Sequence, residues 1–164
     1  MAKREVSKKR SNVVIEGARI IFRNFKGEAT QFNRAGDRNF CVVLDEELAS
    51  DLEADGWNVK RKAPREEGDD ELRYLKVKVA FGNYPPIIKQ VTSRGATKLD
   101  EDTVMILDSA AIENVDLIIS PYEYEVNGKY GVAAYLKKMY VTIAEDDLDK
   151  KYARFEDVEG EPID

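Results

Sequence analysis

Histidine is absent from this chain of 164 residues, and cysteine and tryptophan each occur once. The absence of His excludes Ser-His-Asp triads, His-ligated zinc and His general bases. One cysteine cannot form an internal disulfide. Cys41 lies inside the apolar run 40–44, so we expect it to be a small buried side chain rather than a reactive thiol. Together these absences favour a binding protein over a hydrolytic enzyme.

Long apolar runs are absent as well. No stretch of eighteen apolar residues occurs, so we expect no transmembrane helix and no membrane partner. The first ten residues carry charge without a following apolar stretch, so we expect no signal peptide. The length fits one domain that folds alone or as a homodimer. We therefore expect a cytoplasmic protein.

The formal net charge of −6 is unevenly distributed. Residues 1–11 form a basic N-terminal arm, residues 12–144 form the domain, and residues 145–164 form an acidic tail. Within the domain, cations outnumber acids in two segments, 19–40 and 56–98, whereas segments 45–55 and 99–125 contain acids and no base. The net charge therefore does not exclude a polyanionic partner.

The apolar pattern predicts a mainly β fold with one short helix. We expect strands over residues 12–25, 40–44, 57–62 and 72–81, and a short edge segment over 87–91. Gly17 is placed where the first strand would bend. Asp45 caps a helix over about residues 46–55, which ends at Gly56. A polar loop over 92–102 leads to the apolar segment 103–107 and then to a short turn or helix over 109–114.

Asn127-Gly128, the preferred pair for a tight hairpin turn, stands between two long extended runs, 116–126 and 129–143. The resulting register pairs Tyr124 with Gly131 and Tyr122 with Ala133, a large ring over a small residue in both pairs. The elements together predict six to eight strands in a mostly antiparallel barrel or sandwich.

Cations and aromatic rings occur together in the basic segments, as a single-stranded nucleic-acid site requires for phosphates and unpaired bases. In the strand over 72–81, Tyr74, Lys76 and Lys78 share the face opposite the apolar residues. The alternative is a purely structural role, in which Lys and Tyr are ordinary outward residues of a solvated sheet and Trp57 and a Phe lie in the core. The predicted binding residues are Arg19, Arg23, Phe25, Lys26, Phe32, Arg34, Arg38, Trp57, Lys60, Lys62, Tyr74, Lys76, Lys78, Lys89, Arg94, Tyr135 and Lys137.

The acids of segment 99–125 raise a magnesium-nuclease alternative through Asp100, Glu101, Asp102 and Asp108. Consecutive acids point in different directions, which makes a poor ligand set, and we favour solvated acids. The sequence has no phosphate-binding GxxxxGKS loop and no CxxC pair. We therefore predict no enzyme, no metal site and no cofactor.

Three motifs carry a resemblance to a known family: residues 131–143 followed by acids, residues 22–27 and residues 36–40. Over most of residues 12–155 the chain resembles the single-stranded DNA-binding proteins encoded by tailed bacteriophages. That resemblance implies an OB-like barrel that binds single-stranded DNA during phage replication and recombination, in the host-cell cytoplasm. The matching positions are Phe22, Arg23, Phe25, Lys26, Arg38, Tyr135 and Lys137.

The acidic tail has two interpretations. It is a disordered solubilising end, or it mimics nucleic acid in charge, competes for the basic surface and offers apolar residues to replication or recombination proteins. It differs from better-known single-stranded DNA-binding proteins because it has no long Gly/Gln/Pro-rich linker before it and no terminal Phe. An alternative function for the whole chain is a protein-interaction or phage structural module without nucleic-acid binding.

Overall fold

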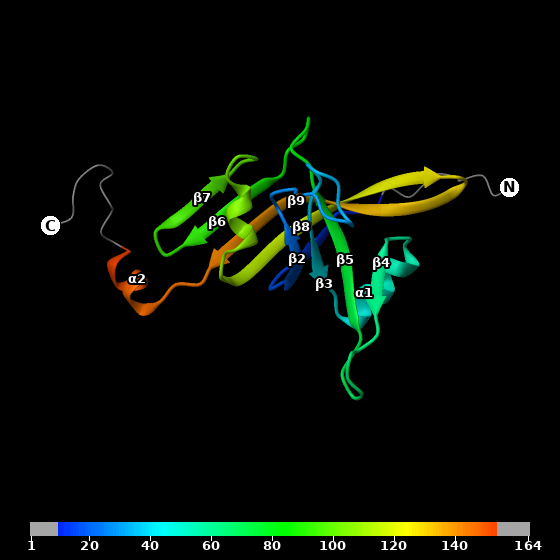
Figure 1. Cartoon of the computed structure of the whole chain (residues 1–164), viewed down its shortest axis with the longest axis horizontal. Coiled ribbons are helices and arrows are strands. Elements are labelled where there is room, and N and C mark those ends of the chain that lie inside the picture. The colour runs from blue at the N-terminus through cyan, green and yellow to red at the C-terminus, as the bar shows by residue number, and fades with distance from the viewer. Residues whose placement is uncertain (1–9, 154–164) are drawn as a thin grey trace.

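The computed structural model describes residues 10–153, which form nine strands, two α-helices and one 3-10 helix (Figure 1). The mainly β fold is as predicted. The elements are β1 (Val13–Ile15), β2 (Ile20–Asn24), β3 (Arg38–Val43), α1 (Glu46–Ala54), β4 (Val59–Lys62), β5 (Leu72–Val79), β6 (Ile87–Thr92), β7 (Gly95–Leu99), η1 (Val104–Asp108), β8 (Ile112–Val126), β9 (Lys129–Ile143) and α2 (Asp147–Tyr152).

The nine strands belong to one curled sheet with the main order β1-β8-β9-β5-β3-β2. The two ends of this path, β1 and β2, are consecutive in the chain. Gly17, with φ +61, lies in the bend between them, as predicted. The sheet thus curls until both ends meet on one bent segment, and no ladder within residues 10–153 closes it into a barrel. Most pairs are antiparallel, but β9 pairs in parallel with both β5 and β6.

The predicted hairpin is confirmed as β8 and β9, the longest strands among the described residues. Asn127 and Gly128 have φ values of 53° and 80°, and a type I′ turn needs positive φ at both central residues. The register pairs Tyr124 with Gly131 and Tyr122 with Ala133, as predicted. A Cβ on Gly131 would lie 2.6 Å from Cζ of Tyr124, so the ring occupies the space that glycine leaves.

The apolar side chains of β3, β5, β8 and β9 form a single core with η1 and α1. On β5, Leu75, Val77 and Val79 are buried while the residues between them face solvent. The helix α1 packs Ala49 and Leu52 onto this core. Its predicted cap is confirmed, because Asp45 accepts a hydrogen bond from the backbone N–H of Leu48 at 2.7 Å.

Three local predictions need correction. The predicted loop 92–102 contains β7, in which Leu99 alone is buried, so an apolar alternation was missing from the sequence. The apolar segment 103–107 contributes to η1, where Val104 and Leu107 are buried. The predicted turn or helix over 109–114 ends in the start of β8 at Ile112.

The predicted arm and tail are described only in part. Arg10, at the end of the arm, forms ion pairs with Asp55 and Glu123 and thereby belongs to the folded domain. In the tail, residues 147–152 form α2 with a capping box between Asp146 and Asp149, so this stretch is helical rather than disordered. The rest of both segments lies outside the described residues. No helix within residues 10–153 has the length and apolar composition needed to cross a membrane.

Candidate nucleic-acid interface

A continuous groove runs over the solvent face of β5 and its neighbours. Four open pockets of about 340 to 800 Å³ adjoin one another there, because each shares lining residues with the next. Phe22 and Lys62 are common to two of them, and Lys76 is common to three. We call this surface the basic groove; its cationic and aromatic lining comprises Arg19, Phe22, Arg23, Phe32, Arg38, Lys60, Lys62, Arg65, Tyr74, Lys76, Lys78, Phe81, Tyr124 and Tyr135.

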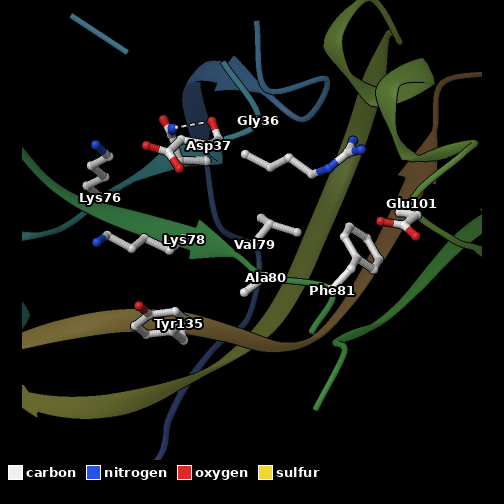
Figure 2. A pocket seen from close by; sticks show the side chains of 11 residues that line it. Gly36, Asp37, Lys76, Lys78, Val79, Ala80, Phe81, Glu101 and Tyr135 are labelled. Carbon is white, nitrogen blue, oxygen red and sulfur yellow. Dashed lines mark hydrogen bonds between the residues drawn. The ribbon is translucent and has the colours of Figure 1, made fainter. Parts of the chain in front are cut away.

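Strand alternation places the lysines of β5 in the groove. Lys76 and Lys78 alternate with buried Leu75, Val77 and Val79 and therefore face solvent. Figure 2 shows their amino groups extending to the same side, with the ring of Tyr135 next to Lys78. The Lys78 ammonium lies 5.8 Å from the centre of that ring, and the parallel register pairs these two residues. The groove therefore offers a positive charge and a ring side by side.

Phe22 forms an exposed ring at one end of the groove because β2 carries a bulge there. The register shifts between Ile21 and Asn24, and Phe22 has a φ of 51°, a left-handed conformation that is uncommon outside glycine. Its side chain is 58% exposed and meets Tyr74 edge-on, with ring centres 5.6 Å apart. Backbone strain of this kind tends to occur at functional sites. Phe32, 86% exposed, lines the same pocket.

A second group of rings borders the other end of the groove on the β8–β9 hairpin. Tyr122 and Tyr135 meet edge-on with centres 5.5 Å apart, and 57% of Tyr122 is exposed. The Tyr124 hydroxyl accepts a hydrogen bond from the side-chain amide of Asn58 at 2.8 Å, which ties the hairpin to the segment after α1. Rings therefore occur at both ends of the row of lysines.

Ion pairs explain why the acids of α1 do not neutralise the groove. On β4, Arg61 points away from the groove and bonds Glu46, Glu53 and Glu71. These hydrogen bonds lower the pKa of Glu46 and of Glu53 below the ordinary value. Because neighbours on a strand face opposite sides, Lys60 and Lys62 point into the groove.

The acids of α1 thus lie with Arg61 on one side of β4, and Lys60 and Lys62 lie on the other. The groove itself has an acidic lining as well, which comprises Glu28, Asp37, Asp69, Asp70, Glu101 and Asp108. Among residues 10–153, four groove lysines form no ion pair: Lys60, Lys62, Lys76 and Lys78.

Ten of the predicted binding residues line the groove, and they come from β2, the segments on either side of it, β3, β4, β5 and β9. They are Arg19, Arg23, Phe32, Arg38, Lys60, Lys62, Tyr74, Lys76, Lys78 and Tyr135. Lys26 and Arg34 are exposed on the loop between β2 and β3, outside these pockets. Lys89 and Arg94 lie on the β6–β7 hairpin, and Lys137 lies on β9 beyond Tyr135.

The prediction that Phe25 and Trp57 stack on bases is wrong, because both rings belong to the core. Phe25 is completely buried and stacks on Phe40, with centres 5.1 Å apart. Trp57 is 4% exposed, and its indole N–H donates to the carboxylate of Asp55 at 3.0 Å. Burying a large ring stabilises the fold more than leaving it in water, and both positions adjoin core strands.

Two arginines of the groove also hold the fold together. Arg23 donates to the carbonyl oxygens of Leu107 and Ala110, which joins β2 to η1. Arg38 donates to the carbonyl of Phe25 at 2.7 Å. Their charges remain at the groove, but hydrogen bonds to backbone carbonyl oxygens fix the position of both guanidinium groups.

Two of the four acids of the nuclease alternative accept hydrogen bonds that hold the fold, and Glu101 lines the groove. Asp108 accepts hydrogen bonds from the backbone N–H groups of Phe25 and Lys26, and Asp100 accepts from Asp102 N and the Thr103 hydroxyl. Within the described part of the chain no group of three His, Cys, Asp or Glu side chains is arranged to hold a metal ion.

The predicted binding residues omit Phe22, Phe81 and Tyr124, which line the groove, and Tyr122, which borders it. Phe22 appears in the sequence as part of a strand, and nothing in the alternation marks a bulge at that position. Tyr122 was identified for its pairing with Ala133, and the hairpin register could have placed it beside Tyr135, because Ser120 pairs with Tyr135.

Comparison with known proteins agrees with this geometry. A family model described as "Putative phage ssDNA-binding domain" matches residues 2–164. The fold is similar to that of the single-stranded DNA-binding protein from bacteriophage Enc34 in complex with ssDNA, with 7% identity, TM-score 0.53 and coverage of 82% of this chain and 88% of that chain. A second structure of the Enc34 protein gives 6% identity, TM-score 0.51 and 82% coverage of each chain.

No curated protein sequence gives a significant match. Because the family model covers nearly the whole chain, the protein belongs to the phage single-stranded DNA-binding domain family.

Proposed function

We propose that this protein binds single-stranded DNA without sequence preference, on strands exposed during phage DNA replication or recombination, and that it does so without catalysis. The observation that carries the proposal is the basic groove, in which lysines without ion-pair partners among the described residues lie between exposed rings. Its support also includes membership of the family and the fold shared with a phage protein solved on ssDNA. We further propose residues 12–144 as the binding domain, flanked by the arm 1–11 and the tail 145–164.

Each part of the groove has a distinct role in this proposal. Lys60, Lys62, Lys76 and Lys78 neutralise successive phosphates of one strand, which releases counterions and makes affinity depend on salt. Phe22, Phe32 and Tyr135 stack on unpaired bases, and because every base has a flat face the contact is independent of sequence. A duplex hides its base faces, so these rings select single strands.

The test is a double variant, Lys76→Gln with Lys78→Gln, titrated with oligo-dT at several salt concentrations. Each phosphate contact on a single strand contributes about 0.7 to the slope of log affinity against log salt, so the slope should fall by about 1.4. The matched control is Lys150→Gln with Lys151→Gln, which changes the net charge equally on α2. The control should retain the wild-type slope.

Three outcomes would contradict the proposal. They are no binding of the wild-type protein to oligo-dT at low salt, equal affinity for duplex and single strands, or equal slopes for the groove variant and the control. A protein-interaction or phage structural module predicts the first outcome together with a stoichiometric complex with a protein. Fluorescence of Tyr135 and the other groove tyrosines, quenched on stacking, provides the signal.

A further inference from the structure

A second cluster of lysines with a ring lies on the β6–β7–β9 part of the sheet, outside the basic groove. Lys98 of β7 pairs with Lys89 of β6, and Lys89 also pairs with Tyr140 of β9, so the three form one row across the sheet. Lys138 lies two residues before Tyr140, with its ammonium 5.4 Å from the centre of that ring. We call Lys89, Lys98, Lys138 and Tyr140 the β6–β9 platform.

The platform faces solvent because the opposite face of the same strands is the core. Ile88, Leu99, Met139 and Val141 alternate with the platform residues and are buried. The Cα register gives Lys89 two platform neighbours, so these side chains share one side of the sheet.

The row carries like charges on β6 and β7, and the acid that continues it on β8, Asp116 opposite Tyr140, accepts a hydrogen bond from the Gly17 N–H. Like charges directly opposite one another on antiparallel strands are destabilising, and Lys89 stands directly opposite Lys98. Within residues 10–153, neither these two lysines nor Lys138 forms an ion pair with a carboxylate. An anion bound over the row would remove this repulsion.

Strand β9 connects the platform to the basic groove. Its parallel neighbour is β5 at Ala134 and Tyr135 and becomes β6 from Lys138 onward. Lys137 is an extra residue on β9, because Ile118 pairs with Lys138 while Ile119 pairs with Leu136. This bulge keeps both Tyr135 and Tyr140 on the outer face although they are an odd number of residues apart.

Five strand residues correspond to about 16 Å at about 3.3 Å each, so the groove and the platform are near neighbours along one strand. In Figure 1 the β6–β7 hairpin lies beside the part of β9 that leads to α2, and β5 lies toward the β8–β9 hairpin.

We infer that the platform binds the next segment of the same single DNA strand that occupies the basic groove. The inference rests on the proposed function. Lys89, Lys98 and Lys138 take phosphates, and Tyr140 provides a ring for a base, so the binding site extends along β9 beyond Tyr135. A strand too short to leave the groove does not reach these residues.

The test compares Lys89→Gln with Lys98→Gln against the control pair Lys150→Gln with Lys151→Gln on an oligo-dT ladder of about 4 to 16 nucleotides, the range of single OB-fold sites. On the shortest oligonucleotides that bind, the platform variant should match the wild type. On the longest, its salt slope should be lower by about 1.4, so a fourfold rise in salt should weaken it about sevenfold less than the wild type. The midpoint of urea unfolding of the platform variant should be equal to or higher than that of the wild type, because a like-charge pair has been removed.

Two results would overturn the inference while leaving the proposed function standing. One is an affinity and slope equal to the wild type at every length. The other is an equal loss at every length, including the shortest, which would make these lysines part of the groove or of a diffuse field. If instead the wild-type protein binds no oligonucleotide, the proposed function itself fails.

Discussion

Phe22 offers a prediction in which stability and DNA binding respond differently to one substitution. Its φ of 51° costs an L-residue about 1 to 2 kcal/mol, and glycine does not incur that cost. Phe22→Gly therefore removes backbone strain together with the ring, whereas Phe22→Ala removes the ring and keeps the strain. The two variants separate what the backbone costs from what the ring contributes.

The expected stability follows from the contacts of the ring. Because 58% of Phe22 is exposed, the remaining burial contributes about 0.6 to 1.3 kcal/mol, and its edge-on contact with Tyr74 contributes about 0.5 to 1.5 kcal/mol. These losses roughly equal the strain that glycine removes. The free energy of unfolding of Phe22→Gly should therefore lie within about 1.5 kcal/mol of the wild-type value. Phe22→Ala should be less stable than Phe22→Gly by about 1 kcal/mol. Inside an ordinary strand the order would be reversed.

The expected loss of binding is the same for both variants. Stacking on one aromatic ring contributes about 1 to 3 kcal/mol, so affinity for oligo-dT should fall about 5- to 150-fold. Tyr84→Gly is the control, because Tyr84 is 94% exposed and does not line the groove. Urea unfolding measures stability, and titration with oligo-dT measures affinity. Wild-type affinity for Phe22→Gly, an equal loss in Tyr84→Gly, or a higher stability of the alanine variant would each refute the reasoning.

Three further predictions concern the scaffold. Gly131→Ala should destabilise the protein by about 1 to 3 kcal/mol in urea unfolding, because a Cβ would displace the Tyr124 ring, whereas Gly82→Ala, with open space around it, should change little. The wild type should be more stable than Arg61→Gln above pH 4.5, and this difference should disappear as the pH falls below that value. The reason is that the lowered pKa values of Glu46 and Glu53 favour the folded state only while both carboxylates are ionised. A difference in stability that persists in acid would contradict the pairing. Burial raises the pKa of the Cys41 thiol to about 11, so a thiol reagent should label the native protein slowly at neutral pH and rapidly in denaturant, and fast labelling of the native protein would show that the thiol is accessible.

Much of the fold was predictable where a local pattern has one physical solution. Asn127-Gly128 specifies the hairpin turn, and the register of β8 and β9 follows from it. Asp45 and Gly56 bound α1 because they satisfy the ends of a helix. The edge strand β7 was not predictable, since with only Leu99 buried it has no alternation to recognise.

The site was predictable where alternation decides the direction of a side chain. Lys76 and Lys78 were placed on the outer face of β5 from Leu75, Val77 and Val79 alone. Phe25 and Trp57 were misassigned because an aromatic residue beside cations looks the same in sequence whether it packs inward or outward. The bulge at Phe22 results from the pairing between β2 and β3, and no residue type in that segment indicates it.

The parallel pairing of β5 with β9 has a consequence for how the protein opens. Its ladder has two registered pairs, Val77 with Ala134 and Lys78 with Tyr135, while the β8–β9 ladder extends over nearly the whole of both strands. Val77 and Ala134 are buried in the core, but a ladder of two pairs has fewer backbone hydrogen bonds to break than the long hairpin ladder, so we expect it to open at a lower free energy. Amide hydrogens at this junction should therefore exchange faster than those of the hairpin. A DNA strand bound over Lys78 and Tyr135 would contact both β5 and β9 and slow that exchange. Hydrogen exchange at this junction would therefore show whether the groove is occupied by DNA.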